Sequence, residues 1–370
     1  MKSTMPSATL VDMKQREQTE EKPSVSVVVP AYNEALLLEN HLTILCHHME
    51  SLQNEYDWEL IVVNDGSTDD TGKIAEAFAR TRDNVRVLHH KINFRLGQAL
   101  RFAFSHCRGD YVVTMDSDLS YSPEHIERLL STIRESHAKI VLASPYMRGG
   151  QISNVPWFRK TLSICANKFL SHAAKGNFST LTGMVRAYDR RFLQTLNLKA
   201  MDMSINAEII YKAMLLRARI VEIPAHLSWA LQDGPGQERK SSIKIVRSIL
   251  SYLLSGFLFR PFMFFILPGF ALMLFSLYPF FWVFMHTVSN LSHIPLSMGP
   301  LDVRLSAAVA QAFQQSPHTF LIGGITLMLS IQLISLGIIA LQNTKYFEEL
   351  FHFNTTLYKL NQDNESQLGK

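Results

Sequence analysis

The sequence predicts an α/β domain with a mostly parallel sheet, followed by an amphipathic helix at a membrane surface and two membrane-spanning helices. Two observations lead to this prediction. Short β-branched runs alternate with helix-length segments in the first half of the chain, which is typical of a parallel sheet covered by helices. In addition, 59 of the 68 Asp, Glu, Lys and Arg residues lie in positions 1–260, and only nine lie in the remaining 110. A water-facing domain therefore precedes a lipid-facing one.

The predicted strands and helices alternate in order along the chain. We expect strands at 25–29, 58–63, 85–88, 111–115 and 139–143, with helices between them at 36–52, 71–82 and 98–107. In a sheet of this kind, ligands bind beyond the carboxyl ends of the strands. The residues that follow each strand therefore carry the functional information.

Composition excludes several other classes of protein. A chain of 370 residues with 47% hydrophobic and 18% charged residues is neither disordered nor collagen-like, and it is too large for a disulfide-stapled miniprotein. The net charge of +4 is scattered, which disfavours nucleic acid as a partner. Cys46, Cys107 and Cys165 form no CxxC pair, which suits a reducing compartment without a zinc site. Residues 1–23 lack the apolar stretch of a signal peptide, so we expect a disordered cytosolic tail.

Asp116 and Asp118 follow the fourth predicted strand and carry the sharpest chemical signal. Residues i and i+2 of an extended chain project to the same face, so both carboxylates can meet one ligand. Mg²⁺ typically takes one or two protein carboxylates together with substrate phosphates. The alternative is that Asp118 only begins a turn into a helix, with Ser122 as N-cap and Pro123 as the first residue. The fingerprints GxGxxG and GxxxxGK[ST] are both absent, which disfavours a dinucleotide-binding dehydrogenase and a P-loop kinase.

Four segments in order resemble the family-2 glycosyltransferases. They are PAYNE at 30–34, VVNDGSTDDT at 62–71, NFRLGQA at 93–99 and MDSDLSYSPE at 115–124. Later segments, including LTGMVRAYDRRF at 181–192, are similar to the branch that glycosylates polyprenyl phosphates, which includes dolichyl-phosphate mannose synthase. The resemblance implies a Rossmann-like GT-A fold over residues 24–240. It also implies transfer of one sugar from a nucleoside diphosphate sugar to undecaprenyl or dolichyl phosphate, with inversion at the sugar.

The resemblance also implies roles for individual residues. The residues that would hold the nucleotide sugar are Pro30, Tyr32, Glu34, Asn64, Asp65, Gly97 and Asp116. Asp116 and Asp118 would bridge Mg²⁺ or Mn²⁺ to the diphosphate, and Arg186 would clamp a phosphate. Asn64 stands at the first acidic position of the usual DDGS, which leaves UDP-linked and GDP-linked donors both open. Arg95 stands where the family often has a glycine.

The acceptor is predicted from a missing motif. Members of the family that act on hydroxyls usually carry an ED pair as general base, and no such pair follows Arg191. A phosphate monoester needs no strong base, because its second pKa is about 6. We predict that Arg239, Lys240 and Lys244 meet the acceptor phosphate, and simple anchoring to anionic lipid is the alternative for this cluster. Two other functions stay open: transfer to a hydroxyl with Asp202 or Glu208 as base, and a non-catalytic scaffold that binds a nucleotide sugar.

The C-terminal third is predicted to sit in a membrane. Apolar residues recur at three- and four-residue spacing in 241–260, which predicts a helix lying flat on the membrane. Membrane-spanning helices are expected at 261–288 and 319–342, with an extracytoplasmic loop at 289–318 and a cytosolic tail at 343–370. Basic residues flank the spans rather than the loop, so the positive-inside rule places the catalytic domain and both termini in the cytosol. Two spans are few for a membrane enzyme, which leaves self-association open.

Overall fold

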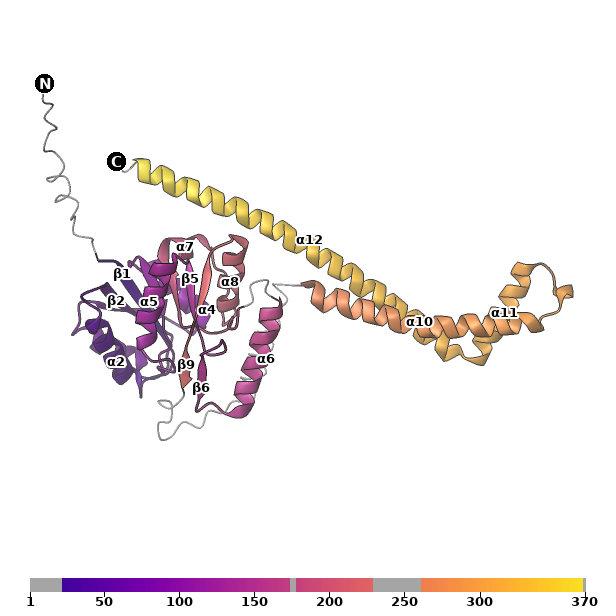
Figure 1. Ribbon diagram of the computed structural model, residues 1–370, viewed down its shortest axis with the longest axis horizontal. Coiled ribbons are helices and arrows are strands. Elements are labelled where there is room, and N and C mark those ends of the chain that lie inside the picture. The colour runs from indigo at the N-terminus through magenta and orange to yellow at the C-terminus, as the bar shows by residue number, and fades with distance from the viewer. Residues whose placement is uncertain (1–21, 174–177, 229–260, 369–370) are drawn as a thin grey trace, which may run out of the picture. The chain divides into compact units, whose positions relative to one another are not determined.

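A computed structural model describes residues 22–173, 178–228 and 261–368. The chain divides into an α/β unit, which holds most of the first 251 residues, and a C-terminal helical unit (Figure 1). The predicted surface helix at 241–260 and the basic residues Arg239, Lys240 and Lys244 lie outside the described residues. The same holds for residues 1–21 of the predicted tail.

The α/β unit is built on a seven-stranded sheet with the strand order β3-β2-β1-β4-β7-β5-β8. Its strands are β1 Ser24–Ala31, β2 Asp57–Asp65, β3 Val85–His90, β4 Tyr111–Thr114, β5 Ile140–Ser144, β7 Arg186–Asp189 and β8 Ile220–Pro224. All five predicted strands are confirmed. Neighbouring strands run parallel except at β7, which is antiparallel to both β4 and β5. Strands β6 Gln151–Ser153 and β9 His226–Ser228 form a separate parallel pair.

Helices cover both faces of this sheet because its strands are apolar on both sides. Val25, Val27 and Val29 of β1 share one core with α2 Leu38–Ser51, α3 Thr71–Ala79 and α5 Glu124–Ser136. The other face is covered by helices α4 Leu96–His106, α7 Arg190–Thr195 and α8 Ile205–Leu215, where α4 contacts α7 and α8. Helix α6 Trp157–Ala173 follows β6. The three predicted helices correspond to α2, α3 and α4.

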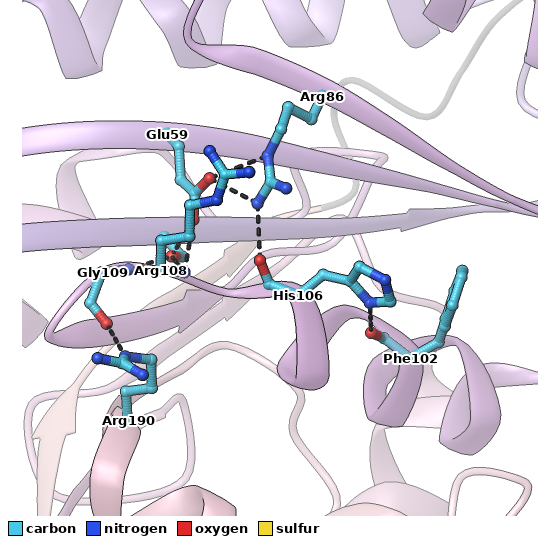
Figure 2. Close-up of polar contacts among 8 residues, drawn as sticks. Glu59, Arg86, Phe102, His106, Arg108, Gly109 and Arg190 are labelled. Atoms are coloured by element: carbon cyan, nitrogen blue, oxygen red, sulfur yellow. Dashed lines mark hydrogen bonds and ion pairs between the residues drawn. The ribbon is translucent and has the colours of Figure 1, made fainter. Parts of the chain in front are cut away.

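A polar network holds the amino ends of the strands together (Figure 2). The half-buried carboxylate of Glu59 on β2 accepts a hydrogen bond from Arg86 Nη2 on β3 at 2.7 Å, and it also accepts one from Ser26 Oγ on β1 at 2.6 Å. Arg86 reaches the carbonyl oxygen of His106, and Arg190 donates to the carbonyl oxygen of Gly109. Polar groups at this edge are therefore occupied in structural bonds.

The helical unit contains two long apolar helices. They are α10 Pro261–His293 and α12 Pro317–Leu368, separated by the short helix η2 Leu296–Met298 and by α11 Leu301–Gln315. Segments Phe264–His293 and Pro317–Leu357 are long and apolar enough to cross a membrane, with mean hydropathies of 1.9 and 2.1. Helix α12 continues unbroken to Leu368, through the segment predicted only as a tail. Its 52 residues correspond to about 78 Å, far more than the roughly 30 Å of a bilayer core.

Candidate active site

A cavity of about 710 Å³ opens at the carboxyl ends of β1, β2 and β4. Among its lining residues are six of the predicted site residues, namely Pro30, Tyr32, Glu34, Asp65, Asp116 and Asp118. They come from three segments of the chain that meet because the strands are parallel neighbours in the order β2-β1-β4. The position agrees with the rule that ligands bind outside the carboxyl ends of strands in open α/β sheets.

Asp116 and Asp118 lie in the loop that leaves β4. Burial, and secondly the negative charge of Asp118, raises the pKa of Asp116 to about 7. The loop is shaped by Asp118, whose Oδ1 accepts the N–H of Ser120 at 3.0 Å, and by His41, whose Nδ1 lies 2.8 Å from the carbonyl oxygen of Ser117. The turn expected at Asp118 is therefore present, but the expected cap is wrong, since α5 begins at Glu124 with Pro123 at the N-cap position.

This pair of carboxylates fits a divalent cation. Two like charges in a buried site favour a cation between them, and carboxylate oxygens are the ligands that Mg²⁺ and Mn²⁺ prefer. Within the described parts of the chain, no group of three or more His, Cys, Asp or Glu side chains is arranged to hold a metal. A cation at Asp116 and Asp118 would therefore need further oxygen ligands, such as the phosphates of a substrate.

Asp65 positions the loop that follows β3. Its Oδ1 accepts the backbone N–H of Phe94 at 3.0 Å and lies 2.7 Å from Nδ1 of His90. Both side chains of this pair are buried. The sequence alone gave no signal for His90, because its partner lies 25 residues away. Asp65 thus connects the end of β2 to the loop that carries Asn93 and Arg95.

Asn64 does not line this cavity. Its Oδ1 accepts the N–H of Ser67 at 3.1 Å, and its Nδ2 lies 3.0 Å from His89 Nδ1. The side chain lines a second, smaller cavity together with Gly72 and Lys73. Adjacent residues of a strand point to opposite faces, so Asp65 and Asn64 cannot both face the same space.

Arg95 is the one basic residue among the described residues that line the main cavity. Its backbone has φ 72° and ψ 168° at the N-cap of α4, a region that is essentially restricted to glycine. This conformation accounts for the glycine that the family often has here. The bonds of the pocket loop impose it, since the N–H of Arg95 donates to Asn93 Oδ1 at 3.0 Å. Arg95 therefore has a strained backbone at the position where its cationic side chain lines the cavity. Four carboxylates line the same cavity.

Gly97 serves packing rather than the cavity. A Cβ at this position would lie 2.5 Å from the carbonyl oxygen of Ala200, so only glycine allows α4 to approach the loop at 200–202. The N–H of Gln98 donates to the carbonyl of Met201 across the same contact, at 3.3 Å. Gly97 is not among the residues that line the cavity, and its contact with the nucleotide sugar stays a prediction.

Arg186 is fully buried, in contrast to the phosphate clamp that was predicted. Its Nη1 donates to the carbonyl oxygen of Asn206 at 2.8 Å, and its Nη2 donates to that of Leu181 at 2.9 Å. The side chain is not among the lining residues of the cavity. Because β7 runs between β4 and β5, Arg186 points into the protein and connects α8 to the loop before β7.

Neither predicted alternative base lines the cavity. Glu208 is buried, pairs with Lys212 at 2.6 Å and accepts the N–H groups of Lys199 and Ala200. Nine consecutive residues of α8, from Ile205 to Ala213, are buried. Asp202 accepts bonds from the hydroxyl and N–H of Ser204, which lower its pKa against the opposing effect of burial, and the charge of Arg95 lowers it further.

Several residues with hydroxyl groups also line the cavity. The sequence gave no warning of them because they lie on segments far apart in the chain. They are Tyr121, Tyr146, Ser163, Thr180 and Thr182. The hydroxyls of Tyr146 and Ser163 are 2.5 Å apart, and burial raises the pKa of Tyr146 so that it stays neutral. The buried hydroxyl of Thr180 has no hydrogen-bond partner among the described residues. These groups offer neutral hydrogen-bond donors to a ligand.

The fold and the acidic cavity define a sugar-transferring enzyme of the GT-A type, and residues 26–196 match the glycosyl transferase family 2. The chain belongs to this family. It is 31% identical over 205 residues to the polyprenol monophosphomannose synthase of Mycolicibacterium smegmatis, covering 54% of this chain and 75% of the synthase. It is 33% identical over 231 residues to the undecaprenyl-phosphate 4-deoxy-4-formamido-L-arabinose transferase of Proteus mirabilis, covering 62% of this chain and 66% of that one.

Two solved structures are similar at the level of the fold. One is the glucosyl-3-phosphoglycerate synthase of Mycobacterium tuberculosis with Mn²⁺, UDP and phosphoglyceric acid, at a TM-score of 0.47 and 21% identity, covering 68% of this chain and 84% of that one. The other is the mannosyltransferase PcManGT of Pyrobaculum calidifontis with GDP-Man and Mn²⁺, at a TM-score of 0.43 and 16% identity, covering 92% and 88%.

Proposed function

We propose that this glycosyltransferase moves one sugar from a nucleoside diphosphate sugar to a polyprenyl phosphate at a membrane surface. The observation that carries the proposal is the acidic pair Asp116 and Asp118 in a cavity with one basic residue, Arg95. A diphosphate bridged to a cation on the two aspartates brings its own negative charge next to Arg95. This balance suits a nucleoside diphosphate donor better than a neutral sugar.

Asp116 and Asp118 are the residues that would hold Mg²⁺ or Mn²⁺. When bound, the cation would neutralise charge that develops on the departing diphosphate. The chain's own groups then orient the donor. Tyr32 is 45% exposed at the cavity, which leaves its ring available to a nucleotide base, and Glu34 lines the same side. Whether the base is uridine or guanosine is decided by contacts on this side.

A phosphate acceptor agrees with the hydroxyl groups that line the cavity. The hydroxyl groups of Tyr146, Ser163 and Thr180 are neutral. In this form they can donate hydrogen bonds to the oxygens of a phosphate. Glu208 is held in an ion pair, so it is not available as a base for a hydroxyl acceptor. An ionised phosphate oxygen can attack the sugar without such a base. The two relatives support a polyprenyl phosphate as acceptor, since one is named as a polyprenol monophosphomannose synthase and the other as an undecaprenyl-phosphate sugar transferase.

Helices α10 and α12 would keep the enzyme beside its lipid acceptor. Their apolar segments are 30 and 41 residues long, and each exceeds the roughly 20 residues that a span requires. The charge pattern favours an orientation with the catalytic domain and both termini on the cytosolic side. The basic residues Arg239, Lys240 and Lys244 remain proposed contacts for the acceptor phosphate.

The test is transfer of labelled sugar into organic-extractable product. The full-length protein is assayed in vesicles with undecaprenyl or dolichyl phosphate, a panel of UDP- and GDP-sugars, and Mn²⁺, Mg²⁺ or EDTA. We expect metal-dependent label in the lipid phase from one donor, loss of this label in Asp118→Asn, and no change in Asp83→Asn, which alters an exposed carboxylate outside the cavity. Label that appears only with a hydroxyl acceptor, or no turnover of any donor, would reject the proposal.

A further inference from the structure

Helix α12 uses one of its faces to pack against α10. Gly323, Ser330 and Gly337 recur at seven-residue spacing on this face. A Cβ at Gly337 would lie 2.4 Å from Ile266 Cγ1, and Ser330 Oγ donates to the carbonyl oxygen of Gly269 at 2.9 Å. Small residues that allow close approach are typical of helix pairs in membranes. This contact accounts for one face of α12. The helix also contacts α11 near its start, where the ring of Phe313 meets that of Phe320.

A second face of α12 follows an unbroken heptad pattern. Alternating steps of three and four residues define a row of positions that we call the α12 seam. Its first half consists of Ile322, Ile325, Leu329, Gln332, Leu336 and Ile339. Its second half consists of Asn343, Tyr346, Leu350, Phe353, Leu357 and Leu360. Every one of these side chains is exposed. Apolar residues repeating every 3.5 positions over more than five heptads are the signature of a coiled coil.

The second half of the seam is informative because it continues beyond the uncharged segment, which ends before Lys345. Six large apolar side chains are exposed after Lys345 among those described, and five of them lie on the seam. Tyr346, Leu350 and Phe353 are each more than 60% exposed. The charged residues Lys345, Glu348 and Glu349 all fall off the seam. A helix that emerges from the lipid should lose its apolar face unless that face is covered.

The first half of the seam contains a different signal, the amide of Gln332. It lies in the middle of the apolar segment Pro317–Leu357, and its side chain is exposed. A polar amide that faces hydrocarbon is costly unless it finds a hydrogen-bond partner. An amide is both donor and acceptor, so it is complementary to its own copy. Asn343 repeats this feature at the equivalent of an a position, where asparagine favours two-stranded pairing in one register.

We propose that α12 pairs along this seam with α12 of a second copy of the chain, as a parallel coiled coil that makes the enzyme a homodimer. The inference rests on the membrane insertion in the proposed function, because copies inserted the same way into one membrane present their helices in the same direction. Equivalent positions then meet, Gln332 with Gln332 and Leu350 with Leu350. No proline or glycine follows Gly337 in α12, so the helix has no break that would allow the second half to turn onto the lipid surface.

Disulfide formation at single positions tests the pairing in the full-length protein in membranes. The exposed Cys165 is first replaced by serine, whereas Cys46 and Cys107 are buried and stay. Leu350→Cys, on the seam, should give a covalent dimer on mild oxidation. The matched control His352→Cys is two residues away, exposed and off the seam, and should give none. Equal dimer yields from the two positions, or no dimer from Leu350→Cys, would overturn the proposal.

The amide contact is tested separately by Gln332→Leu. Subunit counting in vesicles should show two copies for the parent chain and a lower dimer fraction for this variant. Gln342→Leu, the same change at an exposed position off the seam, should behave as the parent chain. Sugar transfer and recovery in the membrane fraction are measured on the same samples. If the protein is recovered in membranes and transfers sugar but remains monomeric, the pairing along the α12 seam is refuted and the proposed function is not. A protein that is not recovered in membranes refutes the membrane anchoring and, with it, the seam.

Discussion

His90 and Asp65 form a buried hydrogen-bonded pair at the edge of the cavity, with 2.7 Å between His90 Nδ1 and Asp65 Oδ1. The same carboxylate oxygen accepts the N–H of Phe94. The pair therefore sets the path of the loop that brings Asn93 and Arg95 to the cavity. His90 also stacks on Phe102 of α4, with ring centroids 4.9 Å apart, which holds the imidazole in place.

Replacing His90 should weaken donor binding without removing the catalytic carboxylates. In His90→Phe the ring stacking remains but the bond to Asp65 is lost, and a hydrogen bond to a charged group contributes about 1.5–3 kcal/mol. We expect the KM for the donor to rise about tenfold or more, with a smaller change in kcat. Steady-state kinetics measure both constants, and His106→Phe, at an exposed histidine of α4 outside the cavity, is the control. An unchanged KM would contradict this role for His90.

Arg95 combines a strained backbone with the cavity's positive charge, and two substitutions separate these effects. Arg95→Gly should stabilise the protein, because a residue in this conformation carries about 1–3 kcal/mol of strain that glycine avoids. Arg95→Ala should leave the strain in place. Both should reduce sugar transfer, since both remove the guanidinium. Thermal unfolding and transfer assays on the two variants give the comparison. Full activity in Arg95→Ala would show that the charge plays no part.

Glu208 should prove to be a structural residue. Glu208→Leu removes the carboxylate partner of the buried Lys212, which keeps its bond to the carbonyl oxygen of Asn197, and it also frees the N–H groups of Lys199 and Ala200. Breaking a buried ion pair from one side costs about 3–5 kcal/mol of unfolding free energy. Denaturant unfolding measures this loss. A partial recovery of stability in Glu208→Leu/Lys212→Met is the matching control. A stable Glu208→Leu protein with no sugar transfer would instead support a role as base.

Stability should fall as the pH drops below about 6.5, through His125. Burial lowers the pKa of His125 from its ordinary value of 6.5. Its Nδ1 lies 2.8 Å from the carbonyl oxygen of Ser122 and its Nε2 accepts the N–H of His226, so the folded state requires the neutral ring. The unfolded chain takes up a proton near pH 6.5, whereas the folded chain does so only at lower pH, and unfolding is therefore favoured in that window.

Unfolding midpoints measured from pH 7.5 to pH 5 check this prediction. The parent chain should lose stability more steeply below pH 6.5 than His125→Gln, which has no proton to take up. His47→Gln, at an exposed histidine of α2, should follow the parent chain. Identical slopes for the parent chain and His125→Gln would contradict the prediction.

The strands, the α2 to α4 helices and the two long apolar helices were predictable because their signals are local. A buried parallel strand such as β1 needs a run of β-branched residues, and a span needs about 20 uncharged ones. Asp116 and Asp118 were predictable for the same reason, since their spacing of two residues and their place after β4 fix their common direction. The resemblance to family-2 glycosyltransferases added Pro30, Tyr32, Glu34 and Asp65.

The roles of other residues depend on contacts between distant parts of the chain. Arg186 matches a motif, but the antiparallel insertion of β7 turns its side chain into the protein, where it bonds to carbonyls of Leu181 and Asn206. Gly97 likewise matches a motif, but the approach of the loop at 200–202 gives it a packing role. Glu208 was open as a base from the sequence, and in the structure it is half of a buried ion pair.

The sequence by itself determined the class of fold, the family and the acidic pair, because hydrophobic periodicity and short motifs depend only on neighbours in the chain. The tertiary structure alone decided which of the motif side chains face the cavity, why an arginine holds a glycine's conformation at position 95, and which face of α12 stays exposed. The physical reason is that the direction and burial of a side chain depend on partners that folding brings from tens of residues away, and no local pattern records them.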